Sequence, residues 1–277
     1  MLSELLGQLL GYSIFYDRIF RIGAATICAS FIVFLFMPYY IKFLKQKNAI
    51  SDFTNLNTTQ VPPIFGGVLL VISIIISTLL FAKINAFVIA ILIILIAYST
   101  VGFIDDYVKI KTNKLIAEGK KQKASYQEKA DGISSRLRLV LYFLFSIIVA
   151  IFAYHFIPGL DGHLTIPFIK PQRWYPQLPP VFFILLISFV TTSTANGANF
   201  TDGMDTLVSI PIITTSIFVG VVAYISGNVI FSKYLLLPHL LGVDELAIIS
   251  AAICGAILSY LWYNCPPAQI YMGDSGS

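Results

Sequence analysis

The chain has 277 residues, of which 57% are hydrophobic and only 12% are charged, and its formal net charge is +4. This composition leaves too little polar surface for a soluble globule of this size, so it excludes that class of protein. We expect instead an all-α, polytopic integral membrane helix bundle, because a helix pairs its own backbone groups where lipid offers them no partner.

Seven stretches are apolar and long enough to cross a hydrocarbon layer about 30 Å thick, which takes roughly 20 helical residues. They lie near residues 22–41, 66–82, 86–104, 138–157, 180–196, 206–226 and 245–263. These stretches lack the strict alternation of a membrane β-barrel. We therefore predict seven membrane-spanning helices that form a single membrane-embedded domain over residues 1–277.

Basic residues distinguish the two ends of these spans, because Lys and Arg in short connections favour the cytoplasmic side. Most of them follow the first and third spans, including a basic loop over residues 105–137. The connections of the other parity hold only Lys83, Lys170, Arg173 and Lys233. We therefore predict that the N-terminus lies outside and that the connections after spans 1, 3, 5 and 7 share the cytoplasmic face.

Each of these four connections carries an unusual polar motif. They read QVPPIFGG after the first span, IDDYVK after the third, NGANFTDGMD at the end of the fifth and NCPPAQIYMGDSGS after the seventh. Four polar motifs that meet at one membrane surface predict a functional site there.

Asp105 and Asp106 end the third apolar stretch. An acid inside a spanning helix costs about 3 kcal/mol on insertion scales, so acids at such places usually have a function. Neighbouring helical residues point about 100° apart, so these two carboxylates reach one metal ion only if the helix breaks there. Lys109 is spaced to pair with either acid. A solvated helix end with a local ion pair is therefore the alternative interpretation.

The fifth motif places polar residues at every third position, which are Asn196, Asn199, Asp202 and Asp205. This spacing drifts by about 60° per step in a regular helix, so all four side chains do not converge unless the helix unwinds. Gly197 and Gly203 permit such unwinding next to a ligand. The alternative is a polar loop whose Asn and Asp side chains cap helices.

In the last motif, glycines flank Asp274, which gives exposed amides beside one carboxylate, although a short Gly-Asp turn is the simpler interpretation. Carboxylates without a His or Cys cluster suit Mg²⁺. The three cysteines, Cys28, Cys254 and Cys265, indicate neither a disulfide framework nor a metal cluster. Together the motifs predict metal-assisted phosphoryl transfer between a cytosolic diphosphate donor and a membrane-resident acceptor.

At these residues the chain resembles the polyprenyl-phosphate N-acetylhexosamine-1-phosphate transferases, most closely the phospho-N-acetylmuramoyl-pentapeptide transferase family. The resemblance rests on GFIDDYVK, GISSRLRL, NGANFTDGMDTL, SKYLLLPHLLGVDEL and LWYNCPPAQIYMGDSGS, which follow in order. It implies Mg²⁺-dependent transfer of phospho-MurNAc-pentapeptide from UDP-MurNAc-pentapeptide to undecaprenyl phosphate, which yields lipid I and UMP for peptidoglycan. It also implies a bacterial inner-membrane location with a cytoplasmic site and no nucleic-acid partner, and it allows a homodimer.

The resemblance also implies roles for individual residues, matched by motif. The residues with implied catalytic roles are Asp105, Asp106, Lys109, Asn199, Asp202 and Asp274. The implied Mg²⁺ ligands are Asp106, Asp202 and Asp274. The implied substrate contacts are Asn196, Gly203, Met204, Asp205, Asn264, Tyr271 and Arg138, with Tyr271 stacking on uracil and Arg138, like Lys109, near the diphosphate. Which acid serves as a base stays open.

Three features depart from the family pattern. A Thr-Pro-Thr-Met-Gly-Gly loop with a nearby lysine reads TTQVPPIFGG here, which leaves substrate contacts at residues 61–67 open. The segment at 112–131 is longer than the family leads us to expect, and we interpret it as a solvated helix. The chain also ends at Ser277, where the family continues through about three more helices. We expect a C-terminally truncated chain with about seven of ten helices and leave its activity open.

Three alternatives stay open at this point. One is a UDP-GlcNAc:undecaprenyl-phosphate GlcNAc-1-phosphate transferase, which uses the same diphosphate chemistry. Another is an ion-coupled transporter, although acids in transporters lie near the midplane between repeated halves, and no repeat is evident here. The third is a catalytically inactive membrane scaffold.

Overall fold

The computed structural model describes the chain except for residues 1, 48, 50–61, 118–131, 165–175 and 203–205. Within the described residues the chain is helical, with no strand beyond one isolated bridge between His163 and Gln177. The helices are α1 (Leu2–Leu10), η1 (Ser13–Tyr16), α2 (Arg18–Gln46), α3 (Gly66–Phe81), α4 (Ala86–Ala117), α5 (Ser135–Phe156), α6 (Pro180–Thr201), α7 (Ser209–Ser226), α8 (Val229–Leu235) and α9 (Glu245–Asn264).

Six helices in the described part are long and apolar enough to cross a membrane, namely α2, α4 as far as Thr112, α5, α6, α7 and α9. The apolar helix α3 has 16 residues. At 1.5 Å per residue it is about 24 Å long, which is shorter than the hydrocarbon layer. Large apolar side chains such as Phe31, Phe182 and Phe218 are exposed on the bundle, as lipid-facing residues are. The prediction of an all-α membrane protein with about seven helices is confirmed.

Helix α9 forms the centre of the bundle. Its most apolar stretch is 72% buried, against 17–28% for the other five spanning helices, and it packs against α2, α3, α4 and α7. A Cβ added at Gly255 would lie 2.2 Å from the Thr26 carbonyl oxygen, so the backbones of α9 and α2 approach closely there. Small residues are what allow such close helix contacts in membranes.

Helices α5 and α6 pack against each other, and α5 also packs against α4. A buried polar network joins these three helices at membrane depth. Tyr98 of α4 donates to the Tyr142 carbonyl (3.1 Å) and is hydrogen bonded to the Ser146 hydroxyl of α5, which lies 3.1 Å from the Thr192 hydroxyl of α6. Such hydrogen bonds hold helices together where lipid supplies no competing partner.

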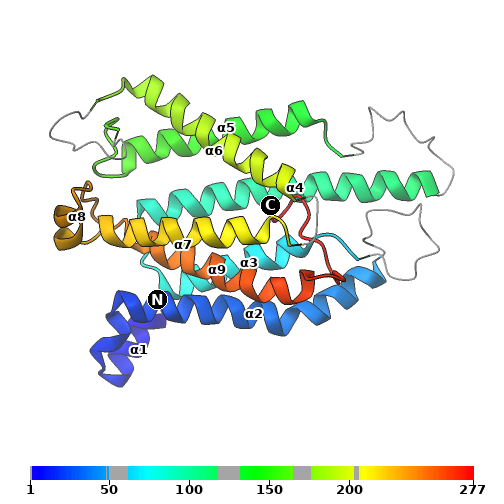
Figure 1. The fold of residues 1–277 in the computed structure, drawn as a ribbon, viewed down its shortest axis with the longest axis horizontal. Coiled ribbons are helices and arrows are strands. Elements are labelled where there is room, and N and C mark those ends of the chain that lie inside the picture. The colour runs from blue at the N-terminus through cyan, green and yellow to red at the C-terminus, as the bar shows by residue number, and fades with distance from the viewer. Residues whose placement is uncertain (1, 48, 50–61, 118–131, 165–175, 203–205) are drawn as a thin grey trace.

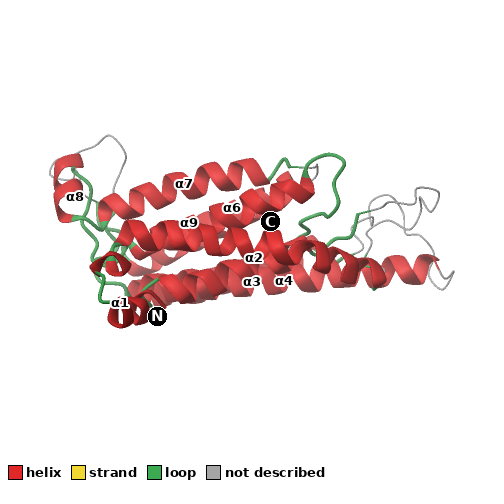
Figure 2. Cartoon of the chain, turned by 90° about the horizontal axis from the view of Figure 1, so that it is seen from below, coloured by secondary structure: helices red, strands yellow, loops and turns green. Residues whose placement is uncertain are grey.

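The long helices run roughly along one axis, and their connections gather at two ends (Figures 1 and 2). One end holds the C-terminus of the chain together with the ends of α2, α4, α6 and α9 and the starts of α3, α5 and α7. The opposite end holds α1, α8 and the starts of α2 and α9. The four motif-bearing connections thus lie at the same end, to the extent that the structure describes them.

A buried ion pair, which was not predicted from the sequence, closes the opposite end. Two Arg21 nitrogens lie 2.8 Å from the two carboxylate oxygens of Glu245. One of these oxygens also accepts from the Lys83 amide (2.8 Å), and Arg21 donates to the Phe81 carbonyl (3.3 Å). The pair therefore ties the start of α2 to the start of α9 and to the α3–α4 connection.

Candidate active site

Helix α4 continues unbroken through Asp105 and Asp106 and ends at Ala117. The two carboxylates are 1% and 2% exposed and point to different partners, as neighbours on an unbroken helix must. The first part of the predicted basic loop at 105–137 is therefore helical, and its residues 118–131 lie outside the described part of the chain. The helix thus places two buried acids against two different sets of partners.

Asp105 lies within a group of charged side chains. Its Oδ1 accepts from the Ile133 amide (2.7 Å), while its Oδ2 lies 2.7 Å from Lys109 Nζ and 3.5 Å from Arg138 Nη1. Arg138 belongs to α5, whose start is capped by the Ser134 side chain. The expected pairing between Asp105 and Lys109 is present, and α5 adds a second cation.

Asp274 joins the same group from the C-terminal loop. Its Oδ2 lies 2.7 Å from both Lys109 Nζ and Arg138 Nη1. Two cations therefore bridge two carboxylates, and we call Asp105, Lys109, Arg138 and Asp274 the ionic cluster. The Lys109 side chain is 30% exposed, so the cluster is open to solvent on one side.

Charge in the ionic cluster determines how Asp274 titrates. Burial alone would raise the pKa of its carboxyl group. The side chain of Asp105 and the positive charges of Lys109 and Arg138 outweigh burial, so the pKa of Asp274 lies below its usual value. Asp274 is therefore ionised at neutral pH and available to a cation.

Asp106 contacts the backbone of the Asp274 loop instead of the cations. Its Oδ1 accepts from the Asp274 amide (3.2 Å) and its Oδ2 from the Ser275 amide (3.1 Å). Gly273 has a φ of +75°, and a Cβ there would lie 2.6 Å from Asp106 Oδ2. Only glycine combines this backbone conformation with so close an approach.

Gly102 lets the same loop lie directly on α4. A Cβ at this position would lie 1.9 Å from the Asp274 carbonyl oxygen, so no larger residue fits without moving the loop. Gly102 and the Ile133 amide were not among the site residues predicted from the sequence. The local signal for Gly102 was weak, since an isolated glycine within a helical pattern is tolerated and only sometimes has a packing reason.

The described part of the first motif, residues 62–67, pairs with the C-terminal loop through backbone hydrogen bonds. The amides of Gly66 and Gly67 donate to the carbonyls of Tyr271 and Met272 (both 2.9 Å), and the Tyr271 amide donates to the Pro63 carbonyl (2.9 Å). These bonds place the start of α3 directly against the loop that carries Asp274.

Helix α6 remains regular through Gly197 and ends at Thr201, so the idea that the chain unwinds at Gly197 is wrong. Asn199 donates to the Ser277 hydroxyl (3.2 Å), whereas Asn196, one turn earlier, is partly buried. The predicted contacts Gly203, Met204 and Asp205 lie outside the described residues.

Asp202 follows α6 as its C-cap residue. Burial, and next the negative charge of Asp274, raise the pKa of Asp202 to about 6, against the lowering effect of Lys109. Asp202 thus lies within electrostatic reach of the ionic cluster. Among the described residues, no hydrogen bond or ion pair to its carboxylate is found, so this carboxylate is available to a ligand.

Two of the predicted substrate contacts lie beneath the site. Asn264 is 5% exposed, accepts from the Thr206 amide (2.8 Å) and donates to the Ile270 carbonyl (3.0 Å). It thereby links the end of α9 to the segment that follows Asp202. Tyr271 is partly buried and packs against the hydrophobic core. Their predicted contacts with nucleotide stay predictions.

The carboxylates at and near the ionic cluster are the candidate ligands for Mg²⁺. No group of three His, Cys, Asp or Glu side chains that could hold a metal occurs in the described part of the chain. Mg²⁺ in phosphoryl-transfer sites is usually held by one or two carboxylates together with substrate phosphates and water. Asp274 and Asp202 fit that smaller requirement. Asp274 supplies an ionised carboxylate, and its negative charge raises the pKa of Asp202, which indicates that the two carboxylates lie near each other.

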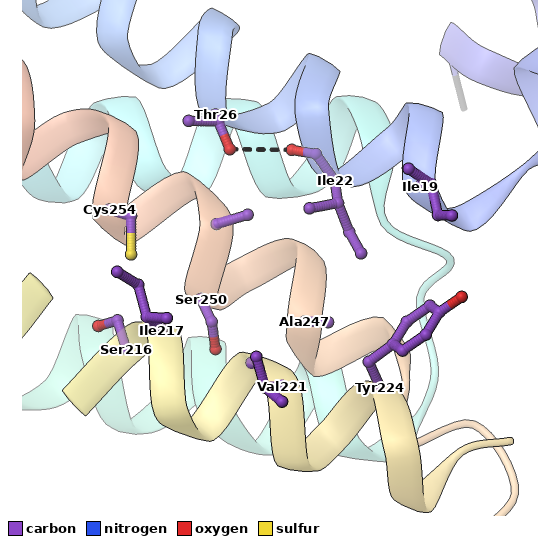
Figure 3. A pocket seen from close by; sticks show the side chains of 12 residues that line it. Ile19, Ile22, Thr26, Ser216, Ile217, Val221, Tyr224, Ala247, Ser250 and Cys254 are labelled. Carbon is purple, nitrogen blue, oxygen red and sulfur yellow. Dashed lines mark hydrogen bonds between the residues drawn. The ribbon is translucent and has the colours of Figure 1, made fainter. Parts of the chain in front are cut away.

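A separate cavity of about 400 Å³ lies between α2, α7 and α9 (Figure 3). Ile22, Ile217, Val221 and Tyr224 line it, and none of the described residues around it is charged. This cavity holds no group suited to phosphoryl transfer. The candidate site is therefore the ionic cluster and not this cavity.

The chain is similar to one known protein family and to several known proteins. Residues 87–277 match the glycosyl transferase family 4. The chain is 35% identical to a phospho-N-acetylmuramoyl-pentapeptide-transferase of Helicobacter pylori strain 26695, over 100% of this chain and 74% of that protein. A protein of the same name from Nitratiruptor sp. is 35% identical over 96% of this chain and 73% of its own length. One from Campylobacter hominis is 37% identical over 93% of this chain and 69% of its own length.

The matched region contains every residue of the ionic cluster. The resemblance inferred from the motifs is thus confirmed by similarity along the whole length of this chain. The chain is an enzyme, a membrane-embedded phosphotransferase that belongs to the glycosyl transferase family 4 and, within it, to the phospho-N-acetylmuramoyl-pentapeptide-transferases.

Proposed function

We propose that this protein transfers phospho-MurNAc-pentapeptide from UDP-MurNAc-pentapeptide to undecaprenyl phosphate, with lipid I and UMP as products and Mg²⁺ as cofactor. The observation that carries the proposal is the ionic cluster. It combines two cations and two carboxylates at the end of a spanning helix, with Asp202 in electrostatic reach. A water-borne diphosphate and a lipid phosphate can meet at that depth.

The main chemical difficulty is electrostatic. A phosphate monoester has a second pKa near 6, so the lipid phosphate is largely a dianion at neutral pH and needs little help from a base. It must instead approach a diphosphate that is also negative. Lys109 and Arg138 lie where they can offset this repulsion and hold the diphosphate for in-line attack. Asp105 keeps both cations in place from its buried position.

Asp274 and Asp202 would hold Mg²⁺, which when bound would neutralise charge on the diphosphate oxygens. Asp274 presents an ionised carboxylate, and the Asp202 carboxylate at the end of α6 has no hydrogen-bond or ion-pair partner among the described residues. Asn199 donates a hydrogen bond to Ser277 and so keeps the end of α6 close to the C-terminal loop. These residues would thus help to bind and orient both substrates.

The test of this proposal is UMP release by the detergent-purified protein, expressed from its own gene. It is supplied with Mg²⁺ and undecaprenyl phosphate, and offered UDP-MurNAc-pentapeptide or UDP-GlcNAc in parallel. We expect release with the muramoyl donor only. Release with UDP-GlcNAc only would move the protein to the alternative transferase. No release with either donor, once lipid and metal are verified, would contradict the proposal.

We also propose that the ionic cluster faces the cytoplasm, because the connections at its end carry most of the basic residues. Cys265 provides a native probe, since it is exposed just after α9 while Cys254 is buried. A membrane-impermeant maleimide should label Cys265 in inside-out vesicles and not in right-side-out ones. A Cys265→Ser variant is the control, and labelling in right-side-out vesicles would reverse the orientation.

A further inference from the structure

We infer that Asp106 is a positioning residue that holds the Asp274 loop through its backbone amides, and that it neither binds Mg²⁺ nor accepts a proton from substrate. The inference rests on the proposed function, since it assigns Asp106 a task within the same site. It differs from the expectation that Asp106 is a metal ligand.

The geometry of the contact carries the inference. Both carboxylate oxygens of Asp106 accept from successive amides, those of Asp274 and Ser275, and the side chain is buried. Successive amides in a turn form a concave site that attracts an anion. Here the protein supplies that anion from α4. Asp106 therefore restrains the backbone of the residue whose carboxylate belongs to the ionic cluster.

The two adjacent acids thus have different partners. Asp105 contacts the cations Lys109 and Arg138, whereas the hydrogen bonds found for Asp106 in the described residues go to loop amides only. A shift of one position along the helix separates them by about 100°. This separation explains why the chain has two successive acids. Asp105 pairs with the cationic side chains of the site, and Asp106 accepts hydrogen bonds from the backbone of the loop.

The opposite side of the loop is held by the start of α3. The amides of Gly66 and Gly67 donate to loop carbonyls, and the preceding residue, Phe65, has a φ of +87°. Such a conformation is strained for a bulky residue and persists only where its surroundings enforce it. Tyr40 contributes one such restraint, because it donates to the Phe65 carbonyl (3.1 Å). The loop is therefore held by α4 through amides and by α3 through carbonyls.

Hydrogen exchange tests the inference without substrate or metal. Peptides that cover residues 266–277 are compared in the parent protein, Asp106→Ala and Asp106→Asn. We expect the amides of Asp274 and Ser275 to exchange about tenfold faster or more in Asp106→Ala, because hydrogen bonds to a charged group are lost. Asp106→Asn keeps one acceptor oxygen and should show an intermediate rate, and kcat should fall in the same order.

A matched control is Glu245→Gln, which alters a buried carboxylate at the opposite end; any faster exchange that it causes should be spread over the protein and should not be selective for residues 274–275. Unchanged exchange at these amides in Asp106→Ala, with turnover lost, would overturn the inference and assign Asp106 a direct role. Equal acceleration throughout the protein would also overturn it, since a local anchor would then be absent. Absence of transfer in the parent protein would contradict the proposed function alone, because the exchange rates are measured without turnover.

Discussion

The two ends of this membrane bundle bury charge in different ways. At one end, two nitrogens of Arg21 meet two oxygens of Glu245, and both side chains are almost fully buried. At the other end, Lys109 and Arg138 share Asp105 and Asp274, and Lys109 is 30% exposed. The first is a closed pair with matched charges. The second is an open group whose members share partners.

The difference shows what each arrangement can do. A closed, desolvated pair fixes three helix ends relative to one another, and any exchange of partners would leave a buried charge alone. In the open ionic cluster, Lys109 and Arg138 each have two carboxylate partners. Either cation can therefore turn toward an arriving phosphate and still keep one of its two carboxylates as a partner. We therefore propose that charge at the first end serves packing and that charge at the second end serves the transfer reaction.

The largest effect on stability is expected at the closed pair. Glu245→Gln removes the negative charge and leaves Arg21 buried without a counter-charge, so the free energy of unfolding should fall by about 3–5 kcal/mol. Thermal unfolding in detergent measures this loss. Turnover per folded molecule should stay close to the parent value, and a selective loss of kcat would show that the closed pair takes part in chemistry.

A smaller effect, on catalysis, is expected at Lys109. Lys109→Gln removes one of two cations that would hold the diphosphate, so kcat/KM for the nucleotide donor should fall by roughly 10- to 100-fold, the worth of one hydrogen bond between charged groups. Steady-state UMP release gives this ratio. Lys109→Arg, which keeps the charge, should retain more activity than Lys109→Gln. If both variants match the parent, Lys109 has no part in holding the donor.

The smallest effect is a pH dependence that sharpens the role of Asp202. Its pKa of about 6 lies above the ordinary value near 3.9, so the group is mostly ionised at pH 7 and becomes neutral as the pH falls below 6. Protons then compete with Mg²⁺, and the half-saturating Mg²⁺ concentration should rise by up to roughly tenfold per pH unit below 6. Titrations of activity with Mg²⁺ at several pH values measure this concentration. The same slope in Asp202→Asn would assign the effect to another group.

Local sequence patterns predicted much of this arrangement. The apolar runs indicated the spanning helices, and the divergence of Asp105 and Asp106 followed from helical geometry alone. The parity of basic connections placed the motif-bearing segments at one end, where the structure joins residues 62–67 to the C-terminal loop. These features depend on spacing within short segments, which a sequence displays directly.

Other features depend on contacts between distant segments and had no local signal. Arg21 and Glu245 are 224 positions apart, and nothing near either residue indicates the other. Asn264 could be matched to a motif, but its buried bonds to Thr206 and Ile270 appear only in the fold. Gly197 suggested an unwound segment, yet α6 is an unbroken helix from Pro180 to Thr201.

We propose that the ionic cluster performs phosphoryl transfer and that the closed pair does not. The most direct test of this proposal is UMP release from UDP-MurNAc-pentapeptide by Asp274→Asn, measured beside Glu245→Gln at equal amounts of folded, membrane-inserted protein. We predict that Asp274→Asn lowers kcat by roughly 10³-fold, since it removes a charge that the transition state needs, while Glu245→Gln turns over at nearly the parent rate. Normal turnover in Asp274→Asn would contradict the account.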